Sequence, residues 1–263
     1  MTPAPFYEKK ASYTAKFSTG AITHYAKAYG LDCGLRSTLH PTIPCQQLEL
    51  VVSNTTKRTM RADLLFYLEP TLTALRDFEA HPAFAKLFVT GSYDRPSQTL
   101  SFIRRSRDLG ESTCLTVGVA GEHRFQYQLD RDKLLSAPGG FAQLRDFARL
   151  PFDGGAACPD AVCAIRLRLK LPAGGQEKVT LLISASKSRS EGIDNIITLR
   201  RSGSLEPKHA APSPLINNTI QGRLGLSILD KLIWGGRLTP HQARLLAENT
   251  GGQSALWHLG ISG

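Results

Sequence analysis

The sequence predicts a mainly β protein in which stacked antiparallel sheets are followed by C-terminal linker helices. Several segments alternate apolar and polar side chains at a period of two residues, which is the periodicity of a strand with one buried face. These segments follow one another closely, without the intervening helix that each crossover of a parallel sheet requires. Helical periodicity gathers near the C-terminus, after residue 188. Together these observations favour a β-sandwich over a doubly wound α/β fold.

The clearest strand spans 163–171, where five apolar residues share one face and three basic residues share the other. The apolar face carries Cys163, Ile165, Leu167, Leu169 and Leu171, and the basic face carries Arg166, Arg168 and Lys170. A helix would scatter these charges around its axis, so the pattern excludes it. The segment 178–184 repeats the alternation after a turn that contains Pro172, Gly174 and Gly175. We therefore expect a β-hairpin from these two strands.

A second hairpin is predicted from the segments 46–53 and 58–70, which flank the turn SNTTK. In the later segment, Leu65 and Tyr67 lie on the face opposite the main apolar row, which predicts a strand covered on both sides. Further candidate strands begin near residues 13, 22, 31, 86, 98, 112 and 124. The total of about ten or eleven strands is enough for two stacked sheets.

Helices are expected after the last strand. Ser188 and Glu191 have the spacing of a capping box, and the apolar positions Ile193, Ile196 and Ile197 would be buried. The segment 203–214 is rich in Pro, Ser and Ala and predicts a linker, so we expect a β-sandwich domain over 1–203 and a linker with helices over 204–263. In the second part, Leu224, Ile228 and Leu232 belong to a helix with apolar residues on more than one side, which needs partners on two sides.

Composition and charge exclude several classes of protein. With 41% hydrophobic and 21% charged residues, the chain of 263 residues is neither disordered nor collagen-like. No apolar run approaches the roughly 18 residues of a membrane-spanning helix, and the start MTPAPFYEKK lacks the apolar core of a secretory signal. The net charge of +10 is spread along the chain, so we expect no nucleic-acid partner. A cytoplasmic location is expected.

Motifs for common chemistries are missing from the sequence. It contains no GxxxxGK, GxGxxG, HExxH or GxSxG segment. The five cysteines form no CxxC pair, which favours a reducing compartment. Cys33, His40 and Cys45 could supply three metal ligands, but the spacing matches no zinc module, and buried apolar thiols are the favoured interpretation. We expect no metal site.

Charged and polar residues offer three weaker candidates. Ser186, Lys187, Ser188 and Arg189 could bind an anion at a helix N-terminus, although ordinary capping explains them equally well. The carboxylate pairs Asp77 with Glu79 and Asp130 with Asp132 could resemble the acid pair of a glycosidase, but solvated loop charge is the favoured interpretation. His81 and His258 lie among apolar neighbours, which predicts packed imidazoles.

Longer stretches carry a resemblance to a known family. LDCGLRSTLHPTIPCQQLELVVSNTTKRTMRADLLFYLEPTL, HPAFAKLFV, FIRRSR, YQLDRDKLL, CPDAVCAIRLRLKLPAGGQEKVTLLISASKSRSE and GGQSALWHLGISG occur in that order. This chain resembles, over about residues 6–263, the supersandwich module of family 94 glycoside hydrolases, particularly the branch of cyclic β-1,2-glucan synthases and related glycoside phosphorylases. The resemblance implies a large antiparallel β-supersandwich, linker helices and then an (α/α)6 barrel that carries the chemistry.

In such enzymes one carboxylic acid of the barrel protonates the leaving oxygen, while inorganic phosphate attacks the opposite face of the sugar. The resemblance therefore implies no metal or organic cofactor, a β-linked glucose oligosaccharide as substrate of the parent enzyme, and a homodimer. No residue here matches the general acid, so no catalytic role is carried over. The residues that match the barrel's entry segment, and could lie near substrate, are Gln253, Ser254, Trp257, Ile261, Ser262 and Gly263. After the Asp130–Arg131 pair the chain departs from the family pattern, so no sugar or dimer contact is carried over there.

Three functional classes follow. The first is a noncatalytic sandwich that braces the catalytic barrel of a glycoside phosphorylase or a cyclic β-1,2-glucan synthase-like glycosyltransferase, and that pairs subunits. The second is a stand-alone carbohydrate-binding module, and the third is a basic scaffold protein. An uncovered apolar patch around Leu224, Ile228 and Leu232 would favour the first, whereas an aromatic-lined groove on a sheet would favour the second.

Overall fold

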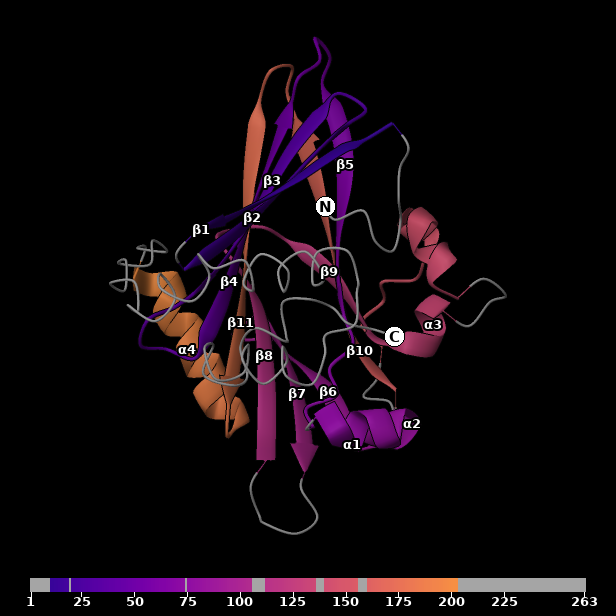
Figure 1. The fold of residues 1–263 in the computed structure, drawn as a ribbon, viewed down its shortest axis with the longest axis vertical. Coiled ribbons are helices and arrows are strands. Elements are labelled where there is room, and N and C mark those ends of the chain that lie inside the picture. The colour runs from indigo at the N-terminus through magenta and orange to yellow at the C-terminus, as the bar shows by residue number, and fades with distance from the viewer. Residues whose placement is uncertain are drawn as a thin grey trace, which may run out of the picture. The chain divides into compact units, whose positions relative to one another are not determined.

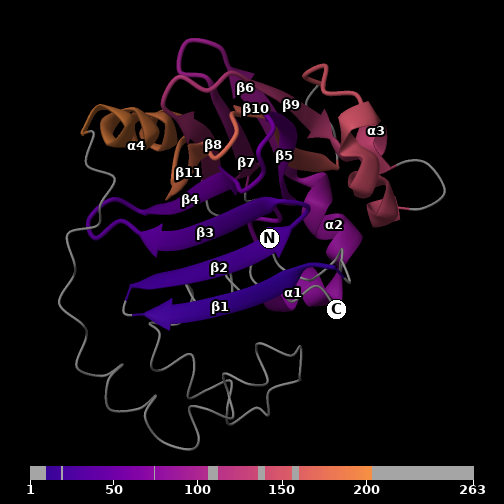
Figure 2. The same cartoon turned by 90° about the horizontal axis from the view of Figure 1, so that it is seen from above.

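The computed structural model describes residues 10–18, 20–73, 75–105, 112–135, 140–155 and 160–202. The chain divides into two compact units, Met1–Lys208 and His209–Gly263, and the described residues all belong to the first. That unit consists of two antiparallel sheets packed face to face, with helices on their outer sides (Figures 1 and 2). The mainly β fold class is therefore confirmed. Among the described residues no helix is long and apolar enough to cross a membrane.

The larger sheet has eight strands in the order β1-β2-β3-β4-β11-β8-β7-β6. Their bounds are β1 Ser12–Ser18, β2 Ala21–Ala28, β3 Leu31–Leu39, β4 Cys45–Asn54, β6 Val89–Asp94, β7 Thr99–Arg105, β8 Ser112–Ala120 and β11 Gln176–Ser186. The smaller sheet has the order β5-β10-β9, with β5 Met60–Leu68, β10 Ala161–Leu171 and β9 Phe125–Asp130. Every strand pair is antiparallel, as the alternation predicts.

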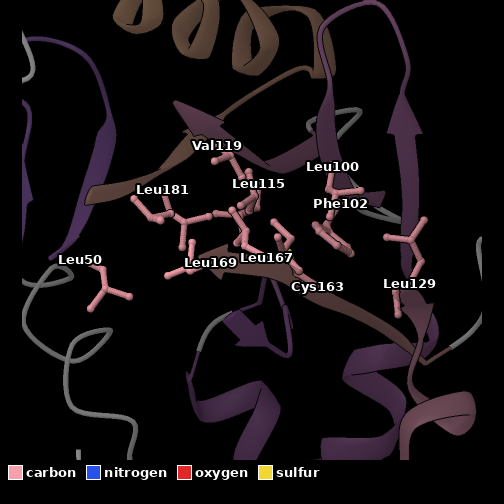
Figure 3. Packing of buried hydrophobic residues seen from close by; sticks show 14 of the residues in the cluster. Leu50, Leu100, Phe102, Leu115, Val119, Leu129, Cys163, Leu167, Leu169 and Leu181 are labelled. Carbon is pink, nitrogen blue, oxygen red and sulfur yellow. The ribbon is translucent and has the colours of Figure 1, made fainter. Parts of the chain in front are cut away.

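The core lies between the two sheets and is built from the alternating apolar residues (Figure 3). Leu100, Phe102 and Val117 from the large sheet and Ile165 and Leu171 from the small sheet are completely buried. Burying one such side chain stabilises the fold by roughly 2 kcal/mol relative to leaving it in water. The predicted apolar face of 163–171 is therefore confirmed as a core face.

Both predicted hairpins are wrong. β10 and β11 follow each other through a short turn, yet β10 pairs with β5 and β9, whereas β11 pairs with β4 and β8. Likewise, β4 belongs to the large sheet and β5 to the small one. Each connection is an arch that carries the chain from one sheet to the other. A hairpin and an arch give the same alternation in the sequence, because both require one apolar face on each strand.

Asn54 ties the two arches together at one end of the sandwich. The Asn54 side chain is buried, and its Nδ2 lies 2.7 Å from the carbonyl oxygen of Arg58, 3.1 Å from that of Leu171 and 2.8 Å from that of Pro172. Its Oδ1 accepts a hydrogen bond from the Thr56 amide at 2.9 Å. One buried side chain thus donates to carbonyl groups of both arches and ties them together.

Helices cover the outer faces of both sheets. The 14-residue α4 (Arg189–Ser202) packs on β8 and β11, while the short α3 (Arg131–Leu135) and the 3-10 segment η1 (Gly140–Arg149) lie on the other side of the sandwich (Figure 2). Leu65 and Tyr67 pack against this second group, so the prediction that their strand is covered on both faces is confirmed. Gly192 of α4 approaches β8 so closely that an added Cβ would lie 2.3 Å from Thr116 Oγ1.

The expectation that helices follow the strands is wrong in part. Besides α3 and η1, two short helices interrupt the strands: α1 (Leu75–Ala80) and α2 (Pro82–Leu87). The candidate strand near residue 86 begins only at Val89, because Pro82 takes the first helical position and starts α2 instead. The boundary at 203–204 stays a prediction, and the linker 203–214 and the helices beyond it lie outside the described residues.

Replacing Asn54 with Ala is expected to lower the free energy of unfolding by about 3 kcal/mol, because a buried side chain loses all of its hydrogen bonds to the two arches together and the buried Leu171 carbonyl loses the Asn54 donor. The measurement is urea-induced unfolding followed by circular dichroism. Thr55→Ala is the matched control in the same arch. Its hydroxyl donates to the Gly30 carbonyl at 3.0 Å from an exposed position, so we expect a loss of only about 0.5 kcal/mol. Equal effects of the two substitutions would contradict the role assigned to Asn54.

Candidate functional site

A cluster of ionised side chains joins the small sheet to the helices beside it. Glu69 follows β5, Lys86 lies on α2, Arg131 begins α3, and Asp160 precedes β10. The Glu69 carboxylate accepts hydrogen bonds from Lys86 Nζ, from Arg131 Nε at 3.0 Å and from the Tyr67 hydroxyl at 2.5 Å. Asp160 completes the cluster, at 3.7 Å from Lys86 Nζ and 3.6 Å from an Arg131 guanidinium nitrogen. Two carboxylates therefore balance two cations.

The cluster holds Glu69 in its charged form. Burial alone would raise the pKa of Glu69, but the hydrogen bonds from Lys86, Tyr67 and Arg131 outweigh burial and lower it. The Tyr67 pKa is raised, first by burial and then by the neighbouring Glu69 carboxylate, so the phenol stays protonated and donates. A carboxylate that is ionised and engaged by three donors is a poor proton donor to a substrate.

The four charged residues of the cluster come from four of the stretches that carry the family resemblance. Glu69 lies in LLFYLEPTL, Lys86 in HPAFAKLFV, Arg131 in YQLDRDKLL and Asp160 in CPDAVC. These stretches are far apart in the sequence and meet only in the fold. Their common task in this chain is to anchor α2 and α3 to the end of the small sheet.

The helix N-terminus at α4 is occupied by its own side chains. Ser188 Oγ accepts a hydrogen bond from the Glu191 amide at 3.2 Å, and Glu191 Oε2 accepts one from the Lys187 amide at 3.0 Å. The predicted capping box is therefore confirmed. Arg189 pairs with Asp94 at 3.3 Å. The anion site considered at Ser186–Arg189 is not favoured, since an anion would have to displace the Glu191 carboxylate.

The three residues weighed as metal ligands serve the backbone and the core. His40 Nδ1 accepts a hydrogen bond from the Ile43 amide at 3.1 Å, which shapes the turn before β4. Cys45 is buried, and burial raises its pKa to about 12, so it remains a thiol. Within the described ranges no group of three or more potential metal ligands occurs.

The other polar candidates have structural roles or lie beyond the described side chains. Asp130 Oδ1 accepts a hydrogen bond from the Asp132 amide at 2.9 Å, so this carboxylate pair caps α3 rather than facing a substrate. The side chain of Asp77 is outside the described set. His81 is exposed at the start of α2, so the expectation of a packed imidazole there is wrong.

The predicted substrate-adjacent residues all lie outside the described residues. These are Gln253, Ser254, Trp257, Ile261, Ser262 and Gly263, and the same holds for His258 and for the patch of Leu224, Ile228 and Leu232. They remain predictions from the resemblance.

A surface that sequence reasoning missed lies on the inner face of β1, β2 and β3. The small sheet packs against β4, β11, β8, β7, β6 and most of β3, where Leu31, Cys33 and Leu35 contact the core. Among the described residues, β1, β2 and the Leu39 end of β3 extend past it (Figure 2). Phe17 and Leu39 on this face are 47% and 49% exposed, and Ile22 is half-buried beside them. The alternation of apolar and polar residues around Phe17 does indicate an apolar face on this strand. Alternation alone, however, does not tell whether a second layer covers that face.

An aromatic group closes the opposite side of the sandwich, where the edge strands β6 and β9 face each other. The rings of Tyr93 and Tyr127 are 4.5 Å apart between centroids, and Phe125 packs edge-on to Tyr93 at 6.4 Å. All three side chains are half-buried and contact the core. Their rings pack on one another, which is the arrangement of a core edge rather than of a sugar-stacking platform.

Comparison with solved structures found chains with low sequence identity. A protein from the human microbiome described as a kojibiose phosphorylase is 8% identical, with a TM-score of 0.42 over 70% of this chain and 20% of that one. A polysaccharide lyase is 13% identical, with a TM-score of 0.38 over 64% of this chain and 22% of that one. The heparan sulfate lyase HepC from Pedobacter heparinus is 8% identical, with a TM-score of 0.36 over 68% and 22%. This chain thus spans about a fifth of each of these structures.

The comparison with curated proteins found no match. Residues 1–202 match the family described as "Glycosyl hydrolase 94, supersandwich domain". The match covers every strand of both sheets and ends at the last residue of α4. The chain therefore belongs to the family of glycosyl hydrolase 94 supersandwich domains.

Proposed function

We propose that this chain is the noncatalytic supersandwich part of a carbohydrate-active enzyme, in which it braces a catalytic (α/α)6 barrel and pairs two subunits. The parent enzyme is a glycoside phosphorylase or a cyclic β-1,2-glucan synthase-like glycosyltransferase. It acts on a β-linked glucose oligosaccharide with inorganic phosphate as co-substrate. Family membership supports the assignment to such an enzyme, and the surface and chemistry of the described residues support the bracing role.

The bracing role is supported by the inner face of β1, β2 and the Leu39 end of β3, which no other described element covers. Phe17, Ile22 and Leu39 present apolar area on the face that, in the rest of the sheet, forms the core. A sheet face of this kind gains stability when a second layer covers it, at about 25 cal/mol per Å² of apolar area removed from water. A neighbouring domain packed against the sandwich would supply that layer.

The chemistry of the charged residues fits a supporting role. Glu69, the carboxylate held by the most donors in the ionic cluster, has a lowered pKa and is ionised at neutral pH. A general acid for glycoside cleavage needs a raised pKa instead, so that it is protonated at neutral pH and can donate its proton to the leaving oxygen. The residues that would touch substrate belong to the segment 253–263 and to the barrel that we propose follows it.

The cellular setting is also a proposal. Cys33, Cys45, Cys114 and Cys163 are free thiols, which suits the reducing cytoplasm. We propose that the domain works there without a metal or organic cofactor, and without nucleic acid or membrane insertion. The alternative, a stand-alone carbohydrate-binding module, would need a sugar-binding aromatic surface, and Tyr93, Phe125 and Tyr127 are engaged with one another instead.

The isolated chain is expected to release no glucose 1-phosphate from β-linked glucose disaccharides in phosphate buffer. The general acid is proposed to lie in the barrel, so the chain alone lacks the proton donor. The measurement is a coupled assay for glucose 1-phosphate, with an active family 94 phosphorylase as the positive control. Turnover that scales with the amount of this chain would overturn the noncatalytic assignment.

Bracing predicts that the reading frame continues past Gly263 into an acidic residue and the helices of an (α/α)6 barrel. In that longer protein, Ile22→Glu is expected to lower phosphorolysis more than about tenfold, because a buried unpaired carboxylate costs several kcal/mol at the domain contact. Thr23→Glu is the matched control, since its side chain points to the opposite face of the same strand. A stop codon directly after Gly263, or equal effects of the two substitutions, would contradict bracing.

A structural role for Glu69 predicts a pH-dependent loss of stability in Glu69→Gln. Since the folded-state pKa of Glu69 is lowered, its contribution is complete above the pKa of the unfolded state and declines as the pH falls through the folded-state value. At pH 7 we expect the variant to unfold about 2 kcal/mol more easily than the wild type, with the difference shrinking in acid.

The measurement for this prediction is urea-induced unfolding at several pH values. Glu49→Gln is the control, because Glu49 pairs with the largely exposed Lys178 and should contribute at most about 0.5 kcal/mol. A difference between Glu69→Gln and the wild type that stays constant from neutral to acidic pH would contradict the assignment.

A further inference from the structure

The fold gathers basic residues on the outer face of the small sheet. On β10, Arg166, Arg168 and Lys170 share this face, and Arg61 of β5 lies directly opposite Lys170. Arg124 immediately precedes β9 and takes the register position beside Arg168. These cations come from three separate segments of the chain. The sequence therefore shows only scattered charge, whereas the sheet brings the charges together.

The helices beside the small sheet cover only one half of this face. Leu134 of α3 and Leu144 of η1 form an apolar cluster with Val162 and Ala164 at the start of β10. The other half lies toward the arches, and Figure 1 shows β5 running past α3 to that end of the sandwich. Four cations on this half are exposed, and we call them the basic patch: Arg61, Arg124, Arg168 and Lys170.

The carboxylate that lies beside the basic patch is committed to a buried partner. Asp63 of β5 accepts a hydrogen bond at 2.8 Å from Arg166, which is only 7% exposed. Its other oxygen lies 3.9 Å from Nε of Arg168, whose side chain is 68% exposed. An exposed ion pair of that length contributes little. Within the described ranges no other ion pair involves the basic patch, so its charge is largely unbalanced.

Like charges face each other within the basic patch. Lys170 and Arg61 are partners across the ladder of β10 and β5, where opposite side chains have their Cβ atoms about 5 Å apart. Arg168 lies two residues before Lys170 on the same face, at a spacing of roughly 7 Å. Like charges placed in this way destabilise a sheet. An anion bound over the patch would remove that repulsion.

The geometry of the basic patch favours an acidic protein segment as that anion. Carboxylates on alternate residues of an extended peptide have the same spacing as Arg168 and Lys170. Three of the four cations are arginines, whose guanidinium groups bind carboxylates through two parallel hydrogen bonds. Nucleic acid is disfavoured, because the patch itself contains no aromatic residue on which bases could stack.

We propose that the basic patch binds an acidic segment of a protein partner, with Asp or Glu at alternate positions of an extended stretch. Its carboxylates pair with Arg168 and Lys170 on β10, and with Arg61 and Arg124 on either side. The patch is separate from the inner face of β1 and β2 that supports bracing. The inference goes beyond the proposed function, and either one can fail without the other.

The experiment measures, by fluorescence anisotropy, the binding of a fluorescein-labelled peptide of alternating Glu and Thr to the full chain. Arg168→Glu combined with Lys170→Glu should weaken binding at least about tenfold, because like charges then meet where ion pairs formed. The matched control is Lys16→Glu combined with Lys27→Glu, the same charge change at exposed positions of the large sheet. It should weaken binding less than about twofold, because exposed charges far from the contact are screened at moderate salt.

A second measurement tests the repulsion without any ligand. Lys170→Glu places a carboxylate opposite Arg61, so it should raise the midpoint of urea-induced unfolding. Lys27→Glu removes an ion pair with Asp32 and should not raise the midpoint. A midpoint that Lys170→Glu leaves unchanged or lowers would overturn the like-charge argument, and with it the need for an anion.

The binding data have three contrary outcomes. No binding of the peptide at low salt overturns the proposal. Equal weakening by the two double variants shows unspecific attraction to a basic protein, and it overturns the basic patch as a site. Tighter binding of heparin or single-stranded DNA, lost in the Arg168 and Lys170 double variant, overturns the acidic protein segment as the partner.

Discussion

The hydrogen bonds of Asn54 determine how the two sheets are connected. The chain crosses from the large sheet to the small one between β4 and β5, and from the small sheet to the large one between β10 and β11, and both crossings lie beside this side chain. At each crossing the backbone no longer forms hydrogen bonds with a neighbouring strand, so its carbonyl groups need other donors. Two backbone hydrogen bonds also join the arches. The Asn54 amide donates to the Gly175 carbonyl oxygen at 2.8 Å, and the Gly174 amide donates to the Thr56 carbonyl oxygen at 3.3 Å. Because this end is tied, β4 and β11 can pair in the large sheet while β5 and β10 pair in the small one.

This arrangement explains what could be predicted from the sequence. Alternation along 163–171 identifies which side chains are buried, because the period of two belongs to each strand by itself. Which sheet a strand joins depends instead on the hydrogen bonds that it can form with other segments. Some of these segments are more than 100 positions away, as with Asn54 and Leu171. A turn of Pro and Gly fits a hairpin and an arch equally well, so local signals favoured the commoner hairpin. The distinguishing residue is a single asparagine within SNTTK, whose side chain is buried in the fold.

The ionic cluster was hidden from sequence reasoning for a similar reason. Its members are single charges in separate segments, each flanked by ordinary surface residues, and only the fold brings Glu69 and Arg131 to 3.0 Å. The resemblance did mark these segments, because each lies in a quoted stretch, but it gave them no physical role. By contrast, the capping box at Ser188 and Glu191 was predictable, since its partners are three residues apart and their geometry is local.

The unequal size of the two sheets connects packing with function. Eight strands face three, so the small sheet can bury the centre of the large one but not its β1 end. A self-contained sandwich would end its large sheet with polar residues on both faces, as negative selection against aggregation favours. Here the alternation continues through Phe17, so the apolar face persists where the covering layer stops. That persistence is costly for a solitary domain, because exposed apolar area promotes unspecific association. It is consistent with a domain whose second layer comes from outside the described residues.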